Sequence, residues 1–284
     1  MSLTGQPFAS DQGGVARILA VLNLTPDSFS DGGRWTGAPV SQIVDAAGQL
    51  LTEGADALDI GGESTRPGAA TISPEAECER ILPAIAALHA AFPQTPLSVD
   101  TRKAQVAAEA VKAGASVIND VSGLQFDPLM ARTAATSGAT LILMHSQGEP
   151  ATMQQNPQYG DVVAEVGAFL AAQADAAIAA GVARERIWLD PGFGFGKTRA
   201  HNLALLRHLS DIVALGFPVL AGLSRKTFLS PLDDQGRAAL APGERDALSA
   251  AAAALALHAG ARMIRLHNVK LHHPVVHWMG ALLA

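Results

Sequence analysis

Short apolar runs alternate with longer alanine-rich segments along the whole chain, and this pattern predicts strands alternating with helices. The apolar runs that predict strands span residues 17–22, 56–60, 97–100, 116–119, 139–144, 187–189, 218–222 and 262–266. The segments with helical spacing span residues 40–54, 74–91, 102–114, 127–137, 160–181, 199–216 and 243–260, and a last helix is expected after residue 271. The strand segments are apolar throughout, as expected of a parallel sheet that is buried on both faces.

Residues that commonly begin and end helices support these boundaries. Ser73 offers a cap, Pro74 suits a first turn, and Glu75 places an acid near the start of a helix. Six glycines follow helical segments, where a left-handed residue often ends a helix, namely Gly54, Gly114, Gly138, Gly181, Gly216 and Gly260. Eightfold alternation predicts an α/β protein with a single-domain TIM (β/α)8 barrel over residues 17–284, after a flexible N-terminal extension of residues 1–16. A doubly wound open sheet is the alternative.

Polar residues gather directly after the predicted strands, whereas the connections from each helix to the next strand are short and bland. The polar clusters occupy residues 23–33, 61–68, 100–102, 119–120, 145–148, 190–197, 224–227 and 267–268. In a barrel, the loops that follow the strands converge on one face, where active sites lie. This asymmetry favours an enzyme over a structural protein or a binding module.

Composition narrows the class of protein further. The 284 residues are 49% hydrophobic and 16% charged, which provides for a large core, and the net charge of −6 gives no support for a nucleic-acid or membrane-surface role. The single Cys78 cannot form an intramolecular disulfide and fits a reducing compartment, and residues 1–16 lack the apolar segment of a signal peptide. We therefore expect a cytoplasmic protein. The alanine-rich stretch 247–259 is better read as a packed helix than as a membrane span.

Five basic side chains stand at the predicted strand ends or loop starts: Arg66, Arg225, Lys226, Arg265 and His267. Gathered on one face, they would attract an anion with more than one charge, and arginine offers a planar fork that suits phosphate or carboxylate. Any one of them could equally be a solvated surface charge. The prediction of an anion site therefore depends on the set.

Three polar residues each terminate an apolar strand: Asp100, Asn119 and Asp190. A carboxylate in a partly buried cleft needs hydrogen-bond donors. A heterocycle rich in N–H groups, such as a purine, a pterin or a guanidine-like ring, would supply them. Helix capping is the alternative for the two aspartates, and a turn is the alternative for Asn119.

The glycine-rich run over residues 190–198 fits neither nucleotide-binding pattern. Pro191 stands where a P-loop needs glycine, and the last glycine of the dinucleotide pattern would fall at Lys197 or Arg199. We expect a flexible loop whose Phe193 and Phe195 can press an aromatic face on a flat ligand. No His/Cys pair has metal spacing, so any metal would be a hard cation on oxygen ligands, such as Mg²⁺ shared with a substrate phosphate.

The chain resembles the dihydropteroate synthase family in eight ordered motifs that lie between residues 18 and 269. The motifs are NLTPDSFSDGG (23–33), DIGGESTRPG (59–68), SVDT (98–101), IND (118–120), LMH (143–145), DPGFGFGK (190–197), SRK (224–226) and RLH (265–267). The first two are long and far more specific than the short ones. The resemblance implies a TIM barrel that condenses 6-hydroxymethyl-7,8-dihydropterin diphosphate with 4-aminobenzoate to give 7,8-dihydropteroate and diphosphate.

The resemblance also implies site residues. The pterin-binding positions are Asp100, Asn119, Asp190, Lys226, Met144, Val121 and Gly222. The diphosphate-binding positions are Asn23, Arg66, Arg265 and His267, with magnesium at Asn23. The aminobenzoate-binding positions are Thr65, Arg66, Phe195 and Thr227. The catalytic positions are Lys226, Asp190 and Arg66, and a lid loop contains Phe29 and Asp31.

The family's reaction is dissociative, so that catalysis consists mostly of stabilising the leaving diphosphate and positioning the amine. The chain departs from the family at Asn268, where aspartate is usual, at residues 146–148 and at Leu24. These departures leave open a pterin-binding paralogue with weak synthase activity. The resemblance implies small-molecule substrates and a homodimer formed through late helices, and we expect no nucleic-acid or membrane partner. A methyltetrahydrofolate-dependent methyltransferase and a non-catalytic pterin-binding protein are the remaining alternatives.

Overall fold

All eight predicted strands are present in the computed structural model, which describes residues 16–25, 38–64, 71–148, 152–233, 235–236 and 238–283. The strands are β1 Arg17–Asn23, β2 Ala57–Gly61, β3 Leu97–Asp100, β4 Val117–Asp120, β5 Thr140–Met144, β6 Ile187–Asp190, β7 Leu220–Ala221 and β8 Met263–Leu266. Each lies within two residues of its predicted bounds. The predicted extension lies outside the described residues, apart from its last residue.

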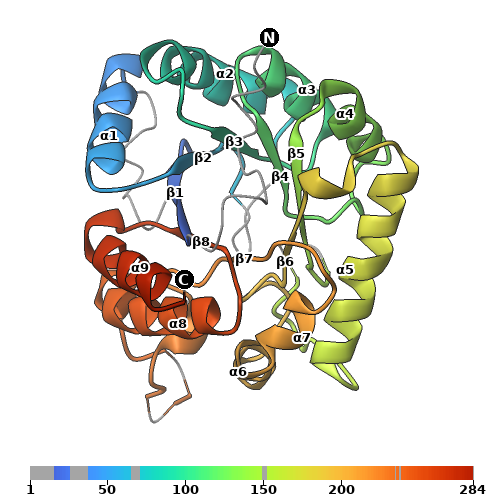
Figure 1. Cartoon of the computed structure of the whole chain (residues 1–284), viewed down its shortest axis with the longest axis vertical. Coiled ribbons are helices and arrows are strands. Elements are labelled where there is room, and N and C mark those ends of the chain that lie inside the picture. Colours follow the sequence, from blue (N-terminus) through green and yellow to red (C-terminus); the bar gives the residue numbers. More distant parts are fainter. Residues whose placement is uncertain are drawn as a thin grey trace.

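The strands form one parallel sheet that curls into a barrel (Figure 1). The strand order is β6-β5-β4-β3-β2-β1-β8-β7, and every ladder is parallel. The two ends meet where Leu189 bridges Val219 and its N–H donates to the Pro218 carbonyl at 3.0 Å. The predicted TIM barrel is therefore confirmed, and the doubly wound open sheet is excluded.

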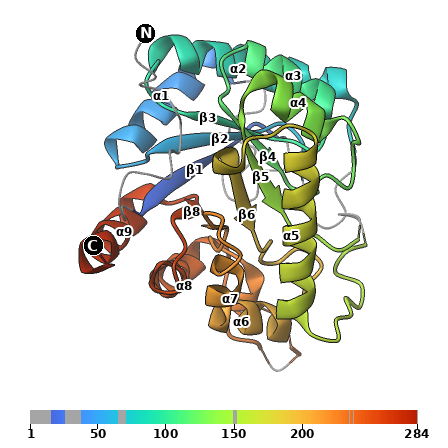
Figure 2. The ribbon, with the colours of Figure 1, turned by 45° about the vertical axis from the view of Figure 1, so that its right-hand side comes forward.

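Helices surround the barrel, as two views of the ribbon show (Figures 1 and 2). The described helices are α1 Val40–Thr52, α2 Pro74–Ala91, α3 Ala104–Lys112, α4 Met130–Ser137, α5 Val162–Ala179, α6 Arg199–Arg207, α7 Leu209–Val213, α8 Asp246–His258 and α9 Val269–Leu283. Short 3₁₀ turns lie at η1 Arg184–Arg186, η2 Thr227–Leu229 and η3 Gly243–Arg245.

Two predicted helix boundaries are wrong. The single helix expected over 199–216 is two helices, because the α-helical ladder ends with the His208 N–H on Ala204 and the next bond is the tighter one from Asp211 to His208. Neither glycine nor proline marks this break in the sequence. The last helix begins at Val269, before residue 271, since the Asn268 side chain accepts from the Leu271 N–H at 3.2 Å.

The predicted start and stop residues act as expected. The Ser73 hydroxyl accepts the Ala76 N–H at 3.2 Å, and Pro74 occupies the first helical position of α2. All six glycines predicted to end helices have positive φ, between 67° and 119°. The local chemistry of the sequence therefore contributes directly to these helix ends.

The inside of the barrel changes from apolar to polar along its axis. A plug of seven inward residues fills its lower layer: Leu19, Ala57, Val117, Ile142, Trp188, Leu220 and Met263. Side chains on a strand alternate between faces, so the next inward residues lie two positions later, at Val21, Asp59, Asn119, Met144, Asp190, Gly222 and Arg265. The outward residues of the strands pack into the larger core beneath the helices. The polar strand ends therefore stand on an apolar floor.

One helix in the described part of the chain, α5, is long and apolar enough to cross a membrane by length and composition alone. Its buried residues recur every three or four positions: Val162, Val166, Leu170, Ala174 and Ala177. Such spacing places them on one stripe, and α5 packs against β5 and β6. We therefore read its apolar character as the core-facing side of a barrel helix. The stretch 247–259 likewise belongs to a packed helix, α8.

Candidate active site

A small pocket opens where the carboxyl ends of the strands converge. Its lining comes from the ends of β3 to β8 and the loops that follow them: Asp100, Asn119, Val121, Met144, Asp190, Gly192, Phe193, Phe195, Gly222, Lys226 and Arg265. The fold thus brings together all seven residues that the resemblance assigns to the pterin. Arg265, assigned to the diphosphate, and Phe195, assigned to the aminobenzoate, also line it.

Asp59 lies in the same inward layer as Asn119 and Arg265 and supports the pocket from beside them. Its Oδ2 accepts from Arg265 Nε at 2.6 Å and from Asn119 Nδ2 at 3.3 Å, while Arg265 Nη2 donates to Asp100 Oδ2 at 2.6 Å. The amide of Asn119 therefore directs its N–H₂ group toward Asp59. Its buried Oδ1 has no hydrogen-bond partner among the described residues, and it remains an acceptor for a ligand N–H.

The sequence interpretation gave Asp59 no role. The signal was present, because an acid in the middle of the apolar strand β2 must find a buried partner. What the sequence did not reveal is that the partner is Arg265, which lies 206 residues away.

Asp190 uses one carboxylate oxygen for the fold and leaves the other near the pocket. Its Oδ1 accepts the Gly192 N–H at 2.7 Å, which anchors the start of the β6–α6 loop rather than capping a helix. A Cβ atom on Gly222 would stand 3.6 Å from Oδ2. Glycine at position 222 therefore keeps the approach to this oxygen open.

Three groups in the pocket have pKa values displaced toward neutrality. Burial raises the pKa of Asp190 to about 6, and burial raises the pKa of Asp100 to about 7 against the opposing charge of Arg265. Burial, followed by the nearby Arg265 guanidinium, lowers the pKa of Lys226 to about 8. A ligand that donates hydrogen bonds to the acids would favour their ionised forms.

Lys226 and Phe195 meet across the pocket. The Lys226 Nζ lies 4.1 Å from the centroid of the Phe195 ring, a cation–π distance. Thr227 follows at the start of η2, where its side chain is exposed and does not line the pocket. The remaining aminobenzoate positions, Thr65 and Arg66, lie outside the described residues, as do Phe29 and Asp31 of the expected lid loop.

The predicted cation cluster is only partly correct. Arg225 points into a separate network, where its Nε and Nη2 bind the two carboxylate oxygens of Asp246 at 2.8 and 3.1 Å. His267 contacts the Ser224 hydroxyl at 3.0 Å, and burial together with Arg265 lowers its pKa to about 3, so it is neutral at pH 7. Lys226 and Arg265 are the members of the cluster that the structure places at the pocket.

Asn268, the departure from the family's usual aspartate, has a structural explanation. Its Nδ2 donates to Asp246 Oδ2 at 2.8 Å, while its Oδ1 caps α9. An aspartate here would face the carboxylate of Asp246, whereas the amide satisfies it. The substitution therefore does not remove a group from the pocket lining.

Asn23 ends β1 on the inward face, and its position suits the rim of the site. Its Oδ1 would lie 3.3 Å from a Cβ atom on Gly61, so glycine at position 61 leaves space beside this oxygen. Among the described residues, no group of three or more His, Cys, Asp or Glu side chains could hold a metal by itself.

The flexible loop predicted over residues 190–198 is instead held in place. Gly192, Gly194 and Gly196 have φ values of 66°, 83° and 62°, and a Cβ atom on Gly192 or Gly196 would collide with a carbonyl oxygen of the β5–α5 loop. Phe193 is buried and stacks on Phe228. The glycines therefore permit close packing of two loops rather than motion.

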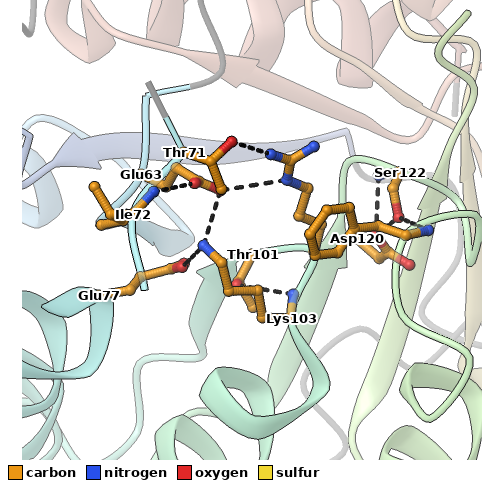
Figure 3. A network of polar contacts seen from close by, with 10 residues as sticks. Glu63, Thr71, Ile72, Glu77, Thr101, Lys103, Asp120 and Ser122 are labelled. Atoms are coloured by element: carbon orange, nitrogen blue, oxygen red, sulfur yellow. Dashed lines mark hydrogen bonds and ion pairs between the residues drawn. The ribbon is translucent and has the colours of Figure 1, made fainter. Parts of the chain in front are cut away.

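A buried ionic network ties together the base of the β2–α2 connection (Figure 3). Glu63 precedes the segment 65–70, and its Oε1 accepts the N–H of Ile72, which follows the segment, at 3.0 Å. The other oxygen, Oε2, binds Lys103 at 3.0 Å and Arg102 at 3.3 Å. Arg102 also donates to Thr71 at 3.1 Å, and Lys103 binds Glu77 at 2.5 Å. The sequence interpretation assigned no role to these residues.

Comparisons with known proteins agree on one group of enzymes. The family model described as pterin binding enzyme matches residues 19–267. The dihydropteroate synthase of Synechocystis sp. is 44% identical over 260 residues, which cover 92% of this chain and 88% of that protein. A Yersinia pestis dihydropteroate synthase solved as a sulfonamide drug complex has a TM-score of 0.87 at 41% identity and covers 94% of each chain. The Xanthomonas albilineans dihydropteroate synthase with 4-aminobenzoic acid has a TM-score of 0.84 at 43% identity, over 95% of this chain and 94% of that one.

Proposed function

This chain belongs to the dihydropteroate synthases within the pterin-binding enzymes, and we propose that it condenses 6-hydroxymethyl-7,8-dihydropterin diphosphate with 4-aminobenzoate, releasing diphosphate. It is thus a transferase of a pterinylmethyl group. The observation that carries the proposal is the convergence of all seven predicted pterin positions on one pocket at the strand ends.

The pterin ring binds between acceptors that the barrel holds in place. Asp100, Asn119 Oδ1 and Asp190 present oxygens from the ends of β3, β4 and β6, and these accept the ring's N–H groups. Lys226 donates to the ring from the opposite loop. Because the acids stand on an apolar floor and are tied to Arg265 and to the Gly192 N–H, they need little rearrangement on binding.

Catalysis rests on stabilising the leaving diphosphate. Arg265 lies in the pocket, while Asn23 ends β1 and His267 directly follows the adjacent strand β8. Arg66 completes this set in the proposal. As negative charge develops on the departing diphosphate, these donors stabilise it more strongly than they stabilise the bound substrate.

Magnesium fits this arrangement as a shared ion. Asn23 Oδ1 offers one hard oxygen beside the space that Gly61 leaves, and diphosphate oxygens and water would supply the other ligands. When bound, the ion would neutralise charge on the leaving diphosphate.

The aminobenzoate binds on the outer side of the pocket in this proposal. Phe195 provides an aromatic wall beside Lys226, and Thr227 stands exposed directly after it. The relative from Xanthomonas albilineans binds 4-aminobenzoic acid and the relative from Yersinia pestis binds a sulfonamide drug, so we extend both ligands to this chain.

Release of diphosphate tests the proposed function. Purified protein is mixed with the pterin diphosphate, 4-aminobenzoate and Mg²⁺, and diphosphate and dihydropteroate are followed together. The synthase forms both products in equal amounts, and removing Mg²⁺ with a chelator lowers the rate. A methyltetrahydrofolate-dependent methyltransferase or a non-catalytic pterin-binding protein would release no diphosphate, and that outcome would exclude the synthase.

We further propose that the protein is a cytoplasmic homodimer that uses α8 and α9. These helices lie side by side (Figure 1), and each exposes apolar residues seven positions apart: Leu248 and Leu255 on α8, and Leu271 and Trp278 on α9. Such stripes are typical of a surface that packs against another copy. The single, half-buried Cys78 supports the cytoplasmic location.

A further inference from the structure

Lys197 is a buried amine without a carboxylate partner among the described residues, and burial lowers its pKa to about 7. It is 3% exposed, and its Nζ contacts His145 Nδ1 at 2.8 Å, the carbonyls of Gly192 and Phe195 at 3.0 Å each, and the His145 carbonyl at 3.3 Å. All four partners are neutral acceptors. Burying an ammonium group without a counter-ion is costly unless such acceptors replace its water shell.

These contacts determine the path of the β6–α6 loop, which carries Phe195. The carbonyl of Gly192 begins the loop and that of Phe195 nears its end, so the ammonium of Lys197 draws both toward His145 on the neighbouring loop. The imidazole accepts from this ammonium as a neutral ring, since burial lowers the pKa of His145 to about 3. The loop thus closes around the Lys197 side chain and around one backbone turn, in which the Phe195 N–H donates to the Gly192 carbonyl at 3.1 Å.

Other side chains hold the remaining backbone groups of the same loop. Gln154 donates to the Gly194 carbonyl, and the Tyr159 hydroxyl donates to the Gly196 carbonyl at 2.9 Å. Asn202 accepts the Gly194 N–H at 2.7 Å. Each of these three side chains contacts a glycine of the loop. Of the four side chains, Lys197 is the one that contacts the carbonyl of Phe195.

We propose that Lys197 is a positioning residue that fixes the Phe195 wall of the aminobenzoate site. This inference rests on the proposed function, because it takes 4-aminobenzoate as the ligand beside Phe195. Lys197 itself touches no substrate. It acts through the backbone of residue 195, whose ring stands 4.1 Å from Lys226 Nζ.

The two substrates should depend on Lys197 to different degrees. Two of the three pterin acceptors, Asp100 and Asn119, sit on β3 and β4, where strand pairing and Arg265 hold them independently of the β6–α6 loop. Phe195 lies in that loop, outside any strand or helix. Loss of the Lys197 amine should therefore move the aminobenzoate wall and leave these two pterin acceptors in place.

The test compares Lys197→Met with the wild type, using Lys112→Met on the exposed surface of α3 as the control. Lys197→Met should raise the KM for 4-aminobenzoate on the order of tenfold or more, as expected for a displaced contact group, while the KM for the pterin diphosphate stays within about threefold. Lys112→Met should leave both unchanged. An unchanged KM for 4-aminobenzoate, or an equal rise of both KM values, would overturn the inference.

Two further measurements keep the test decisive. If Lys197→Met does not fold, Lys197→Gln, which retains two N–H donors, is measured by the same criterion. Calorimetric binding of 4-aminobenzoate to the protein saturated with a pterin and diphosphate gives the same comparison without turnover. A wild type that binds 4-aminobenzoate but releases no diphosphate would therefore contradict the proposed function while the role of Lys197 is still decided.

Discussion

Asp190 combines a structural and a binding role in one carboxylate. Its Oδ1 holds the Gly192 N–H, and its Oδ2 faces the space beside Gly222. Burial raises the pKa of Asp190 to about 6, so folding favours the protonated acid between its unfolded pKa near 4 and this value. The stability that this proton contributes is complete at low pH and is lost as the pH rises through about 6.

Asp190→Asn should reveal this contribution. The amide oxygen can still accept the Gly192 N–H, but the side chain cannot ionise, so it lacks the destabilisation that the wild type gains with rising pH. The free energy of unfolding of the variant minus that of the wild type should therefore increase from pH 4 to about pH 6.5 and level off above. Urea unfolding at several pH values measures it. A difference that is constant or shrinks over this range would show that burial does not raise this pKa.

At the scale of single elements, the β6–α6 loop shows how glycine serves packing rather than motion. Gly192 has a φ of 66°, and an added Cβ atom would lie 1.9 Å from the His145 carbonyl oxygen. Gly236 has a similar φ of 74°, but no heavy atom of the described residues lies within 4 Å of an added Cβ. Substituting alanine at Gly192 and at Gly236 therefore separates two destabilising effects, the left-handed backbone conformation and the collision of the added Cβ atom.

Gly192→Ala should lower the free energy of unfolding by about 2–4 kcal/mol, because it adds a backbone collision to the strained φ. Gly236→Ala, the control, should lower it by only about 1 kcal/mol. Chemical denaturation of both variants provides the comparison. Equal losses for the two variants would mean that the β6–α6 loop can move away from the β5–α5 loop without cost.

The network at the base of the β2–α2 connection is a second element with a strong structural role. Glu63, which precedes the segment 65–70, accepts the N–H of Ile72 after it, and buried Lys103 lies between Glu63 and Glu77. A charge removed from such a network leaves a buried cation with fewer partners. Glu109, which pairs with Lys112 on the exposed face of α3, provides a matched surface pair.

Glu63→Gln should therefore lower the free energy of unfolding by about 2–4 kcal/mol, even though the amide can still accept the Ile72 N–H. Glu109→Gln should change it by less than about 0.5 kcal/mol. Thermal and urea unfolding of the two variants test this difference. The importance assigned to the network would be refuted by a loss for Glu63→Gln as small as that for the surface pair.

At the scale of the whole molecule, the barrel leaves one exposed apolar surface unexplained by the active site. Trp278 on α9 is 61% exposed, and Leu255 on α8 is 59% exposed. Leu129, which is 60% exposed, lies at the start of α4, on the far side of the barrel from α9 (Figure 1). Trp278 and Leu129 are thus almost equally exposed but lie on different faces of the barrel.

Trp278→Lys should shift the protein from dimer to monomer in analytical ultracentrifugation at micromolar concentration, because a charge would be buried at the proposed interface. Leu129→Lys should leave the sedimentation coefficient unchanged. Trp278 lies away from the pocket, so the activity of the Trp278→Lys variant also shows whether a monomer is active. A wild type that sediments as a monomer at all concentrations, or a Trp278→Lys variant that remains dimeric, would exclude this interface.

The sequence alone determined the barrel and the identity of most pocket residues. Strand length, helix caps and helix-ending glycines depend on the local sequence. Periodicity and turn chemistry therefore located the strands to within about two residues. Polar residues at strand ends predicted one functional face, because parallel strands direct their carboxyl ends the same way. Asp100, Asn119, Asp190 and Lys226 were therefore predicted without any knowledge of their contacts.

Only the tertiary structure decided how these groups are charged and held. Asp59 meets Arg265 across the barrel, Arg225 pairs with Asp246 instead of facing an anion, and His267 is a neutral ring. The packing of the β6–α6 loop also depends on the tertiary structure. Its glycines predict a flexible loop from the sequence, but in the fold they pack against the β5–α5 loop, and Lys197 binds the loop's carbonyls. Such contacts join residues far apart in the chain, and neither periodicity nor local propensity carries information about which distant side chain will lie there.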